Sequence, residues 1–189
     1  MILYYTIEKY DKNGLVSSTR KRRARSFIKA FIYMLANRFT GSGYATENTG
    51  GSPTSMFYQN YYRMFTTPAQ SNLQSQGIVV GSSSSAVQST QYCLQALMAN
   101  GSAASQLQYG PHISDQAVTV AAPSASFSIS RIFRNKSGGD VTVREIGFYV
   151  VSNNYTQWHC LVRDTVSPMV VSDSQYIKVT YTFQITAGA

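Results

Sequence analysis

The chain has 189 residues, a mass of 20.9 kDa and a formal net charge of +8, from 16 Lys and Arg against 8 Asp and Glu. This length suits one domain, or one domain with an attached segment, and it is enough to bury a core without disulfides or metal ions. Only 13% of the residues are charged and another 13% are aromatic, which argues against a typical cytosolic metabolic enzyme and against a disordered chain.

Nearly all of the net charge lies in the first forty residues. Residues 1–40 contain nine basic and two acidic residues, a net charge of +7, whereas the remainder contains seven basic and six acidic residues, a net charge of +1. Such an asymmetry is typical of a segment that meets an oppositely charged partner.

The same forty residues predict a hairpin followed by a helix. Residues 2–10 form a β-like run, and the turn at residues 11–14 contains Asn-Gly and leads to a return strand at residues 15–18. Residues 26–39 carry apolar side chains at helical spacing, with Ser26 as a candidate N-cap, so we expect a buried helix there. Between the hairpin and the helix lies a basic run: Arg20, Lys21, Arg22, Arg23 and Arg25.

A linker rich in Gly, Ser and Thr at residues 40–55 leads to an aromatic segment at residues 56–65. This segment is either a core strand or helix, or a contact between subunits, because Tyr, Phe, Met and Arg are enriched in the cores of interfaces. In the second interpretation the assembly contacts are Phe57, Tyr58, Tyr61, Tyr62 and Phe65. We therefore expect a basic N-terminal arm over residues 1–76 and a β-sandwich domain over residues 77–189.

The second half of the chain consists mainly of short runs that predict strands. A short helix is expected at residues 90–99, and Gly147 is a candidate bulge. In the run at residues 126–133, Phe127, Ile129 and Phe133 are expected to point inward. Short alternating runs separated by turn residues predict an antiparallel β-sandwich of about seven or eight strands. The expected strands are residues 77–81, 106–110, 117–121, 126–133, 141–151, 158–164, 169–171 and 176–186.

Three of these runs resemble a pattern found in virion proteins of tailed bacteriophages. Residues 141–149 (VTVREIGFY), 161–164 (LVRD) and 177–183 (IKVTYTF) are similar to the strands of β-sandwich modules in tail, collar and fibre-attachment proteins. Residues 77–81 and 106–110 resemble segments of phage structural proteins of this size. The resemblance covers roughly residues 77–187 and implies a structural component of the virion, which would be assembled in the host cytoplasm.

No constellation of catalytic residues stands out. The sequence has no G-x-S-x-G nucleophile elbow, and His159 and Cys160 are neighbours on a predicted strand, so they point to opposite faces. Glu145 and Arg163 lie on adjacent predicted strands and are expected to form a cross-strand ion pair. With two Cys and two His in the chain, we expect no disulfide framework, no metal site and no cofactor, and we expect a protein that is not an enzyme.

The basic run has three interpretations. It is a solvated or salt-bridged segment, a contact with an acidic neighbouring protein, or a non-specific contact with DNA phosphates. No aromatic residue interrupts it, so stacking on single-stranded nucleic acid is not indicated.

The sequence thus predicts a structural subunit whose partners are copies of itself and other virion proteins, with the basic arm as an anchor. No stretch of 18 apolar residues occurs, so no membrane span is expected, and the N-terminus lacks the basic region that opens a secretory signal peptide. The alternative is a module that binds a receptor or glycan on the host surface through aromatic residues on loops: Tyr44, Tyr155 and Trp158.

Overall fold

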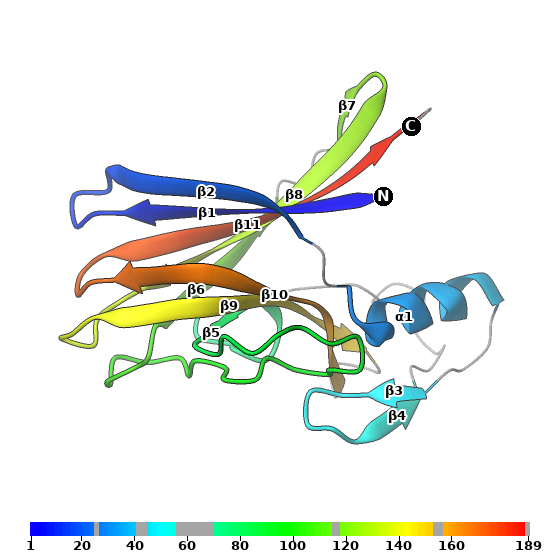
Figure 1. Ribbon diagram of the computed structural model, residues 1–189, viewed down its shortest axis with the longest axis horizontal. Helices are drawn as coiled ribbons and strands as arrows, with labels where there is room; N and C mark the ends of the chain where they lie inside the picture. Colours follow the sequence, from blue (N-terminus) through cyan, green and yellow to red (C-terminus); the bar gives the residue numbers. More distant parts are fainter. Residues whose placement is uncertain (25–26, 41–44, 56–69, 115–117, 153–156, 188–189) are drawn as a thin grey trace.

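The computed structural model describes residues 1–24, 27–40, 45–55, 70–114, 118–152 and 157–187 (Figure 1). Two antiparallel β-sheets face each other, so the prediction of a mainly β, antiparallel sandwich is confirmed. The elements in chain order are β1 (Ile2–Tyr10), β2 (Val16–Ala24), α1 (Lys29–Thr40), β3 (Ala45–Glu47), β4 (Pro53–Ser55), β5 (Gly77–Gly81), β6 (Gln108–Ser114), β7 (Thr119–Ala121), β8 (Ser124–Arg134), β9 (Val141–Ser152), β10 (Gln157–Val171) and β11 (Tyr176–Thr186).

The larger sheet, sheet A, has the strand order β2-β1-β11-β8-β6, and β7 pairs with β8 near one end. Alternation sets its inner face: Leu3, Tyr5 and Ile7 of β1 are buried, and the residues between them are partly exposed. On β11 the matching positions are Ile177, Val179 and Tyr181, none of which is exposed. These side chains form one wall of the hydrophobic core.

The smaller sheet, sheet B, has the order β10-β9-β5 and supplies the opposite wall. All five residues of β5 are buried, as expected for a short apolar strand between two glycines. The register of β9 and β10 shifts between Cys160 and Val162 and again between Thr165 and Met169, whereas Gly147, the predicted bulge, pairs regularly with Arg163. Gly147 is instead a position of close approach, because a Cβ there would overlap the Leu94 Cδ1.

The N-terminal hairpin exists, but it is not an arm. The β1 strand pairs over its whole length with β11, from Ile2 opposite Gln184 to Tyr10 opposite Tyr176. The predicted boundary at residue 76 therefore cuts through sheet A. The return strand is also longer than expected, because β2 extends to Ala24 and contains the cations Arg20–Arg23. The apolar alternation of β1 explains why the hairpin belongs to sheet A, since the inner face of β1 can be buried only within the sandwich.

The predicted helix is confirmed, with a start three residues later than expected, and Ser26 lies outside the described residues. Just before it, Phe27 forms an antiparallel bridge with Val162 of β10. Ile28, Ala30 and Met34 are buried, while Ile32 and Tyr33 on the other side are exposed. The β3–β4 hairpin lies beside the helix (Figure 1).

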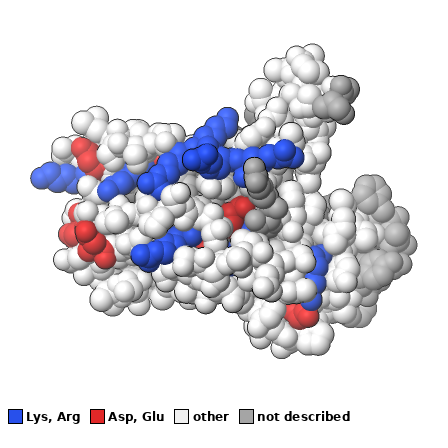
Figure 2. Space-filling model, in the orientation of Figure 1, with Lys and Arg blue, Asp and Glu red and all other residues white. Residues whose placement is uncertain are grey.

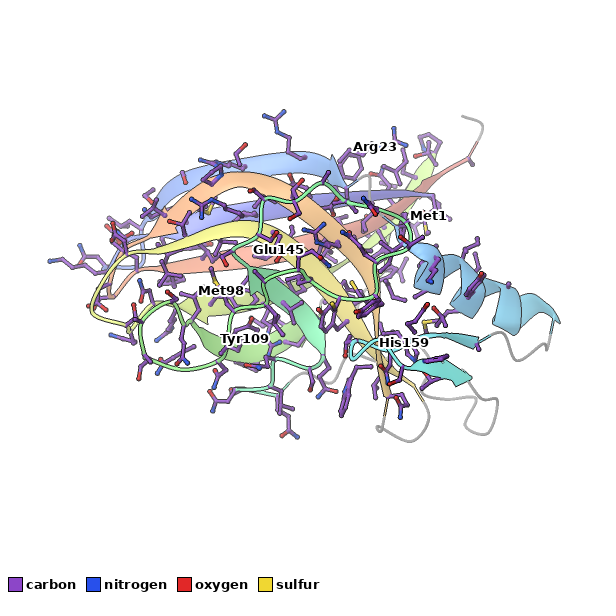
Figure 3. The ribbon with its side chains drawn as sticks, turned by 60° about the horizontal axis from the view of Figure 1, so that its bottom comes forward. Met1, Arg23, Met98, Tyr109, Glu145 and His159 are labelled. Carbon is purple, nitrogen blue, oxygen red and sulfur yellow. The ribbon has the colours of Figure 1, made fainter. Side chains whose placement is uncertain are left out.

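The helix predicted over residues 90–99 is wrong. Residues 82–107 form a long loop that contains no helix or strand and crosses sheet B (Figure 3). The Glu145 side chain of β9 accepts hydrogen bonds from the backbone N–H groups of Gln95 and Ala96, at 3.2 and 2.7 Å. The Tyr149 hydroxyl likewise accepts the Leu94 N–H at 2.7 Å. These partners replace the carbonyl groups that would accept the same N–H groups in a helix.

Candidate interaction site

Four cations of the predicted basic run lie on β2, the edge strand of sheet A. We call Arg20, Lys21, Arg22 and Arg23 the basic strand; all four are exposed, and Arg25 lies outside the described residues. Lys and Arg form a band along this edge of the molecule (Figure 2). Among the described strands, β2 pairs only with β1, so its other edge has backbone N–H and C=O groups that no strand satisfies.

The strand geometry separates the cations into two sets. Arg20 and Arg22 lie opposite the buried residues Ile7 and Tyr5, and therefore point toward the side of sheet A that faces sheet B. Lys21 and Arg23 point to the outer side, where the Lys21 ammonium lies 5.4 Å from the centre of the Tyr4 ring. The basic run is thus two charged rows along one strand edge.

A groove of about 630 Å³ separates the basic strand from β10, the edge strand of sheet B. At one end the Arg20 guanidinium donates to the backbone carbonyls of Ser167 and Pro168, at 2.8 and 3.2 Å. Beyond the C-terminal end of β2, Phe27 forms a bridge with Val162 of β10. We call the opening between these contacts the edge groove. Its lining residues are Tyr5, Arg22, Arg23, Ala86, Val87, Asp164, Thr165 and Ser167.

The edge groove has one acidic residue in its lining. Asp164 is 5% exposed, and its carboxylate accepts a hydrogen bond from the Tyr181 hydroxyl at 3.5 Å. Burial and then the Asp164 charge raise the pKa of Tyr5, and the two arginines of the inner row partly oppose this shift. Burial, with Asp164 next, also raises the pKa of Tyr181 well above its usual value. Both phenols therefore remain protonated at neutral pH, and that of Tyr181 donates to Asp164.

A second surface lies where sheet A extends beyond sheet B. On β11, Tyr181 is fully buried but Ile185 is 58% exposed, and on β8, Phe133 is fully buried but Phe127 is 39% exposed. The Phe127 and Phe183 rings stack with their centres 4.8 Å apart. We call this end of the sheet the overhang; its apolar residues are Met1, Val118, Val120, Phe127, Phe183 and Ile185.

The overhang carries no formal side-chain charge over long stretches of its strands. Residues 116–130 and 179–189 contain no Asp, Glu, Lys or Arg. In Figure 1 the β7 end of the sheet projects away from the body, and in Figure 2 no charged side chain is visible on it. The molecule therefore has a charged edge and an uncharged apolar end.

The predicted pair of Glu145 and Arg163 is confirmed as a buried ion pair. The Arg163 Nε donates to the Glu145 Oε2 at 2.7 Å, and neither side chain is exposed. The remaining Arg163 N–H groups donate to the Gln91 side chain at 2.9 Å and to the Ser85 carbonyl at 3.1 Å. Glu145 lies beneath the long loop (Figure 3). The pair therefore holds the long loop against sheet B, which is a structural role.

Sequence reasoning missed a second buried arginine. Arg131 of β8 is fully buried, and its guanidinium donates to five backbone carbonyls at 2.6–3.0 Å. It also lies 4.9 Å from the centre of the Tyr109 ring. Burial lowers the pKa of Arg131 to about 10, so it remains charged at neutral pH. Arg131 and Phe133 are two positions apart on an alternating strand, and this spacing alone would have placed Arg131 on the inner face.

The two cysteines and His159 do not form a reactive cluster. Both Cys93 and Cys160 are free thiols. Burial raises the pKa of the Cys160 thiol well above its usual value, and burial followed by the Glu145 charge raises that of Cys93. His159 makes a 3.2 Å contact with the Glu47 carbonyl. No group of three or more His, Cys, Asp or Glu that could hold a metal ion occurs among the described residues.

Several predicted residues fall outside the part of the chain that the structure describes. This is the case for Phe57, Tyr58, Tyr61, Tyr62 and Phe65, the proposed assembly contacts, and for Tyr44 and Tyr155 of the receptor-binding alternative. Trp158 is described and is half-buried at the start of β10, where its carbonyl accepts the Thr49 N–H at 2.9 Å. Within the described ranges, no helix is long and apolar enough to cross a membrane.

Comparisons of the chain with protein-family models, with curated protein sequences and with solved structures each found no match.

Proposed function

We propose that this chain is a structural subunit that binds copies of itself and other proteins in a larger assembly. The resemblance described above suggests the virion of a tailed bacteriophage, in its tail, its collar or neck, or a ring that attaches fibres. In this proposal the overhang joins copies of the chain, and the basic strand anchors them to an acidic neighbour.

The observation that carries the proposal is the overhang. The inner face of sheet A continues past sheet B with the same apolar alternation, but Val120 and Ile185 there are 76% and 58% exposed. A contiguous apolar surface of this kind is typical of a protein–protein contact. A net charge of +8 makes copies of the chain repel one another. An uncharged surface is where they can meet with the least repulsion.

Sedimentation velocity of the purified chain tests this role. We expect the wild type to form oligomers and the double variant Val120→Glu/Ile185→Glu to sediment as a monomer, because each change places a carboxylate in the contact. The matched control is Leu15→Glu/Val170→Glu, two exposed apolar positions on the hairpin turn and on β10. A monomeric wild type, or equal loss of oligomers in the control, would contradict the proposal.

The virion assignment has its own test. The genes on either side of the one that encodes this chain should include portal, terminase or tail genes. Flanking genes of metabolic enzymes would count against a virion and leave the self-association experiment unaffected.

A further inference from the structure

We propose that the basic strand is the docking site for an acidic, extended segment of another protein, which adds to β2 as a further antiparallel or parallel strand of sheet A. This inference rests on the proposed function, since it names the chemistry of the anchor's partner. Three features of the described residues support it: the unpaired edge of β2, the two rows of cations and the edge groove.

The unpaired edge supplies the main-chain part of the site. The β2 strand runs over nine residues and pairs on one side only. An added strand satisfies the free N–H and C=O groups of such an edge, which is how β-strand addition generates affinity. Eight of the nine residues are exposed, and the exception is Ala24 at its end. An approaching strand therefore meets exposed residues along most of the length.

The cations supply specificity for acidic side chains. On an added strand, successive side chains alternate between the two faces of the sheet. Side chains on the inner face would meet Arg22 at the edge groove, and those on the outer face would meet Lys21 and Arg23. Cross-strand pairs of opposite charge stabilise adjacent strands, whereas like charges destabilise them. A segment with carboxylates on both faces is therefore complementary to this edge, and a basic segment is rejected.

The edge groove favours a protein partner over nucleic acid. Its lining contains Asp164, which is 5% exposed and would repel a phosphate in the groove. Arg20, the fourth cation, already donates to the carbonyls of Ser167 and Pro168. A phosphate backbone also has no N–H or C=O groups that match a strand edge. A polypeptide satisfies the edge, and short polar side chains can enter the groove beside Thr165 and Ser167.

A competing explanation is that the cations only protect the edge. Charged residues on edge strands, lysine above all, prevent pairing between copies of the same sheet. That role makes a different prediction, because removal of the charge would then let two β2 edges pair. The experiment below includes this outcome.

The test measures binding of a synthetic acidic peptide to the purified full-length chain by fluorescence anisotropy. The probe is a labelled peptide of about nine residues, a usual strand length, in which pairs of adjacent Glu are separated by single Thr residues, so that carboxylates lie on both faces of the strand. The control peptides are one with Lys in place of Glu and one with pairs of adjacent Pro, which remove N–H donors from both edges of the peptide so that it cannot pair as a strand. A DNA duplex with a similar number of charges is the nucleic-acid arm.

The variants compare the basic strand with cations elsewhere. Arg22→Glu/Arg23→Glu reverses two charges on β2, and Lys12→Glu/Lys136→Glu reverses two exposed charges in turns, so both variants have the same net charge. We expect the β2 variant to bind the acidic peptide at least about tenfold more weakly, a change of about 1.4 kcal/mol, and the control to bind it like the wild type.

Hydrogen exchange separates strand addition from simple charge attraction. The acidic peptide should slow exchange of those β2 amides that point to the free edge, by at least about tenfold, because they become hydrogen-bonded. Binding without this protection, equal loss in both variants, or tighter binding of the duplex than of the peptide would overturn the proposal. Absence of peptide binding would also overturn it, and self-association of an Arg22→Ser/Arg23→Ser variant would then show that the cations only protect the edge.

Failure here is distinguishable from failure of the proposed function. Self-association through the overhang is read by sedimentation of the Val120 and Ile185 variant, which leaves β2 unchanged. If copies associate through the overhang but the acidic peptide does not bind, the proposal of a structural subunit stands and only the proposal of an acidic partner strand fails.

Discussion

At the scale of single residues, the buried charges connect segments that lie far apart in the sequence. The chain has few charged residues, and three of them, Arg131, Glu145 and Arg163, are fully buried. Each is hydrogen-bonded: Arg131 donates to backbone carbonyls, and Glu145 and Arg163 bond to each other and to the long loop. Since a buried charge is tolerated only when it is paired and hydrogen-bonded, these side chains hold their surroundings in one arrangement.

The first prediction concerns the buried pair. We expect Glu145→Gln to lower the free energy of unfolding by about 3–5 kcal/mol, because it leaves the Arg163 guanidinium buried without its counter-charge. Urea unfolding followed by circular dichroism measures this. The matched control is Glu8→Gln, which removes the carboxylate of a half-buried pair with Lys178 at 4.0 Å. We expect that change to cost less than about 1 kcal/mol. Similar costs for both variants would mean that the buried pair does not anchor the loop.

The second prediction concerns the glycine beside this pair. A Cβ at Gly81 would lie 2.5 Å from both the Ala96 carbonyl oxygen and the Glu145 Oε1. We therefore expect Gly81→Ala to destabilise the protein by about 1–3 kcal/mol, the usual cost of overpacking.

Gly139→Ala is the control for this change, because nothing lies within 4 Å of the position that its Cβ would take. Its effect should stay within about 0.5 kcal/mol, as for most surface positions. A tolerated Gly81→Ala would show that the loop can move away from sheet B at little cost.

At the scale of elements, strict alternation predicted the last strand to the residue, whereas the runs at residues 158–164 and 169–171, expected as two strands, form the single strand β10. The strand at residues 176–186 has its predicted bounds, because apolar and polar residues alternate along it without a break. The segment at residues 90–99 failed for a different reason. Its apolar residues Leu94, Leu97 and Met98 have helical spacing, but a carboxylate from β9 takes the N–H groups of Gln95 and Ala96. A partner some fifty positions away in the sequence leaves no trace in a local pattern.

The position of the basic run in the fold was also only partly predictable from the sequence. Its charges suggested an exposed arm, and exposure is correct for Arg20–Arg23. Their place on a paired strand was not predicted, since consecutive cations show no apolar alternation. The pairing follows from β1, whose alternating apolar residues are buried in the core between the sheets and whose two edges pair with β11 and β2. The groove between β2 and β10 depends on this pairing and was therefore also beyond the sequence.

The third prediction concerns the β3–β4 hairpin, which His159 of β10 contacts through the Glu47 carbonyl at 3.2 Å. Figure 3 places His159 beside this hairpin. Burial lowers the pKa of His159 below its usual value of 6.5, and the contact with Glu47 only partly opposes this shift. The unfolded chain therefore binds a proton more readily than the folded protein. Stability is fully present above about pH 6.5 and declines as the pH falls toward the lowered pKa.

Urea unfolding at a series of pH values tests this. We expect the wild type to lose stability between about pH 7 and pH 5.5, and the variant His159→Gln to show a flatter profile in the same interval. The Glu47 carboxylate does not account for the slope, because its hydrogen bond from Lys29 lowers its pKa and keeps it ionised there. An unchanged slope in the variant would assign the pH dependence to another group.

At the scale of the whole molecule, the two ends of the described chain are interdependent. The first strand lies between β2 and β11, within sheet A and not at its edge. Leu3 and Ile7 are each only 1% exposed, so the N-terminal hairpin contributes to the main core. The division into an arm and a domain, which the charge distribution suggested, does not separate two folding units.

The fourth prediction follows from this arrangement. We expect a chain that lacks residues 1–24 to lose cooperative unfolding, because β11 would lose one of its two neighbouring strands and the core residues that pack against Leu3, Tyr5 and Ile7 would be exposed. Circular dichroism and urea unfolding measure the outcome. The control keeps β1 and replaces only exposed cations, in the variant Lys21→Ser/Arg22→Ser/Arg23→Ser, which should remain folded. A stable, cooperatively unfolding fragment of residues 25–189 would restore the interpretation of the hairpin as an arm.

The pairing of β1 with β11 also sets an order of events during synthesis. On the ribosome, β1 and β2 emerge long before β11, the other partner of β1. More than 150 residues separate β2 from β11, and their synthesis takes on the order of 10–30 s at usual rates of translation. Through this interval the hairpin is a two-stranded unit of marginal stability with Leu3, Tyr5 and Ile7 uncovered. The cations of β2 would then serve a second purpose, because neighbouring nascent chains with the same charge repel one another while each waits for its last strand.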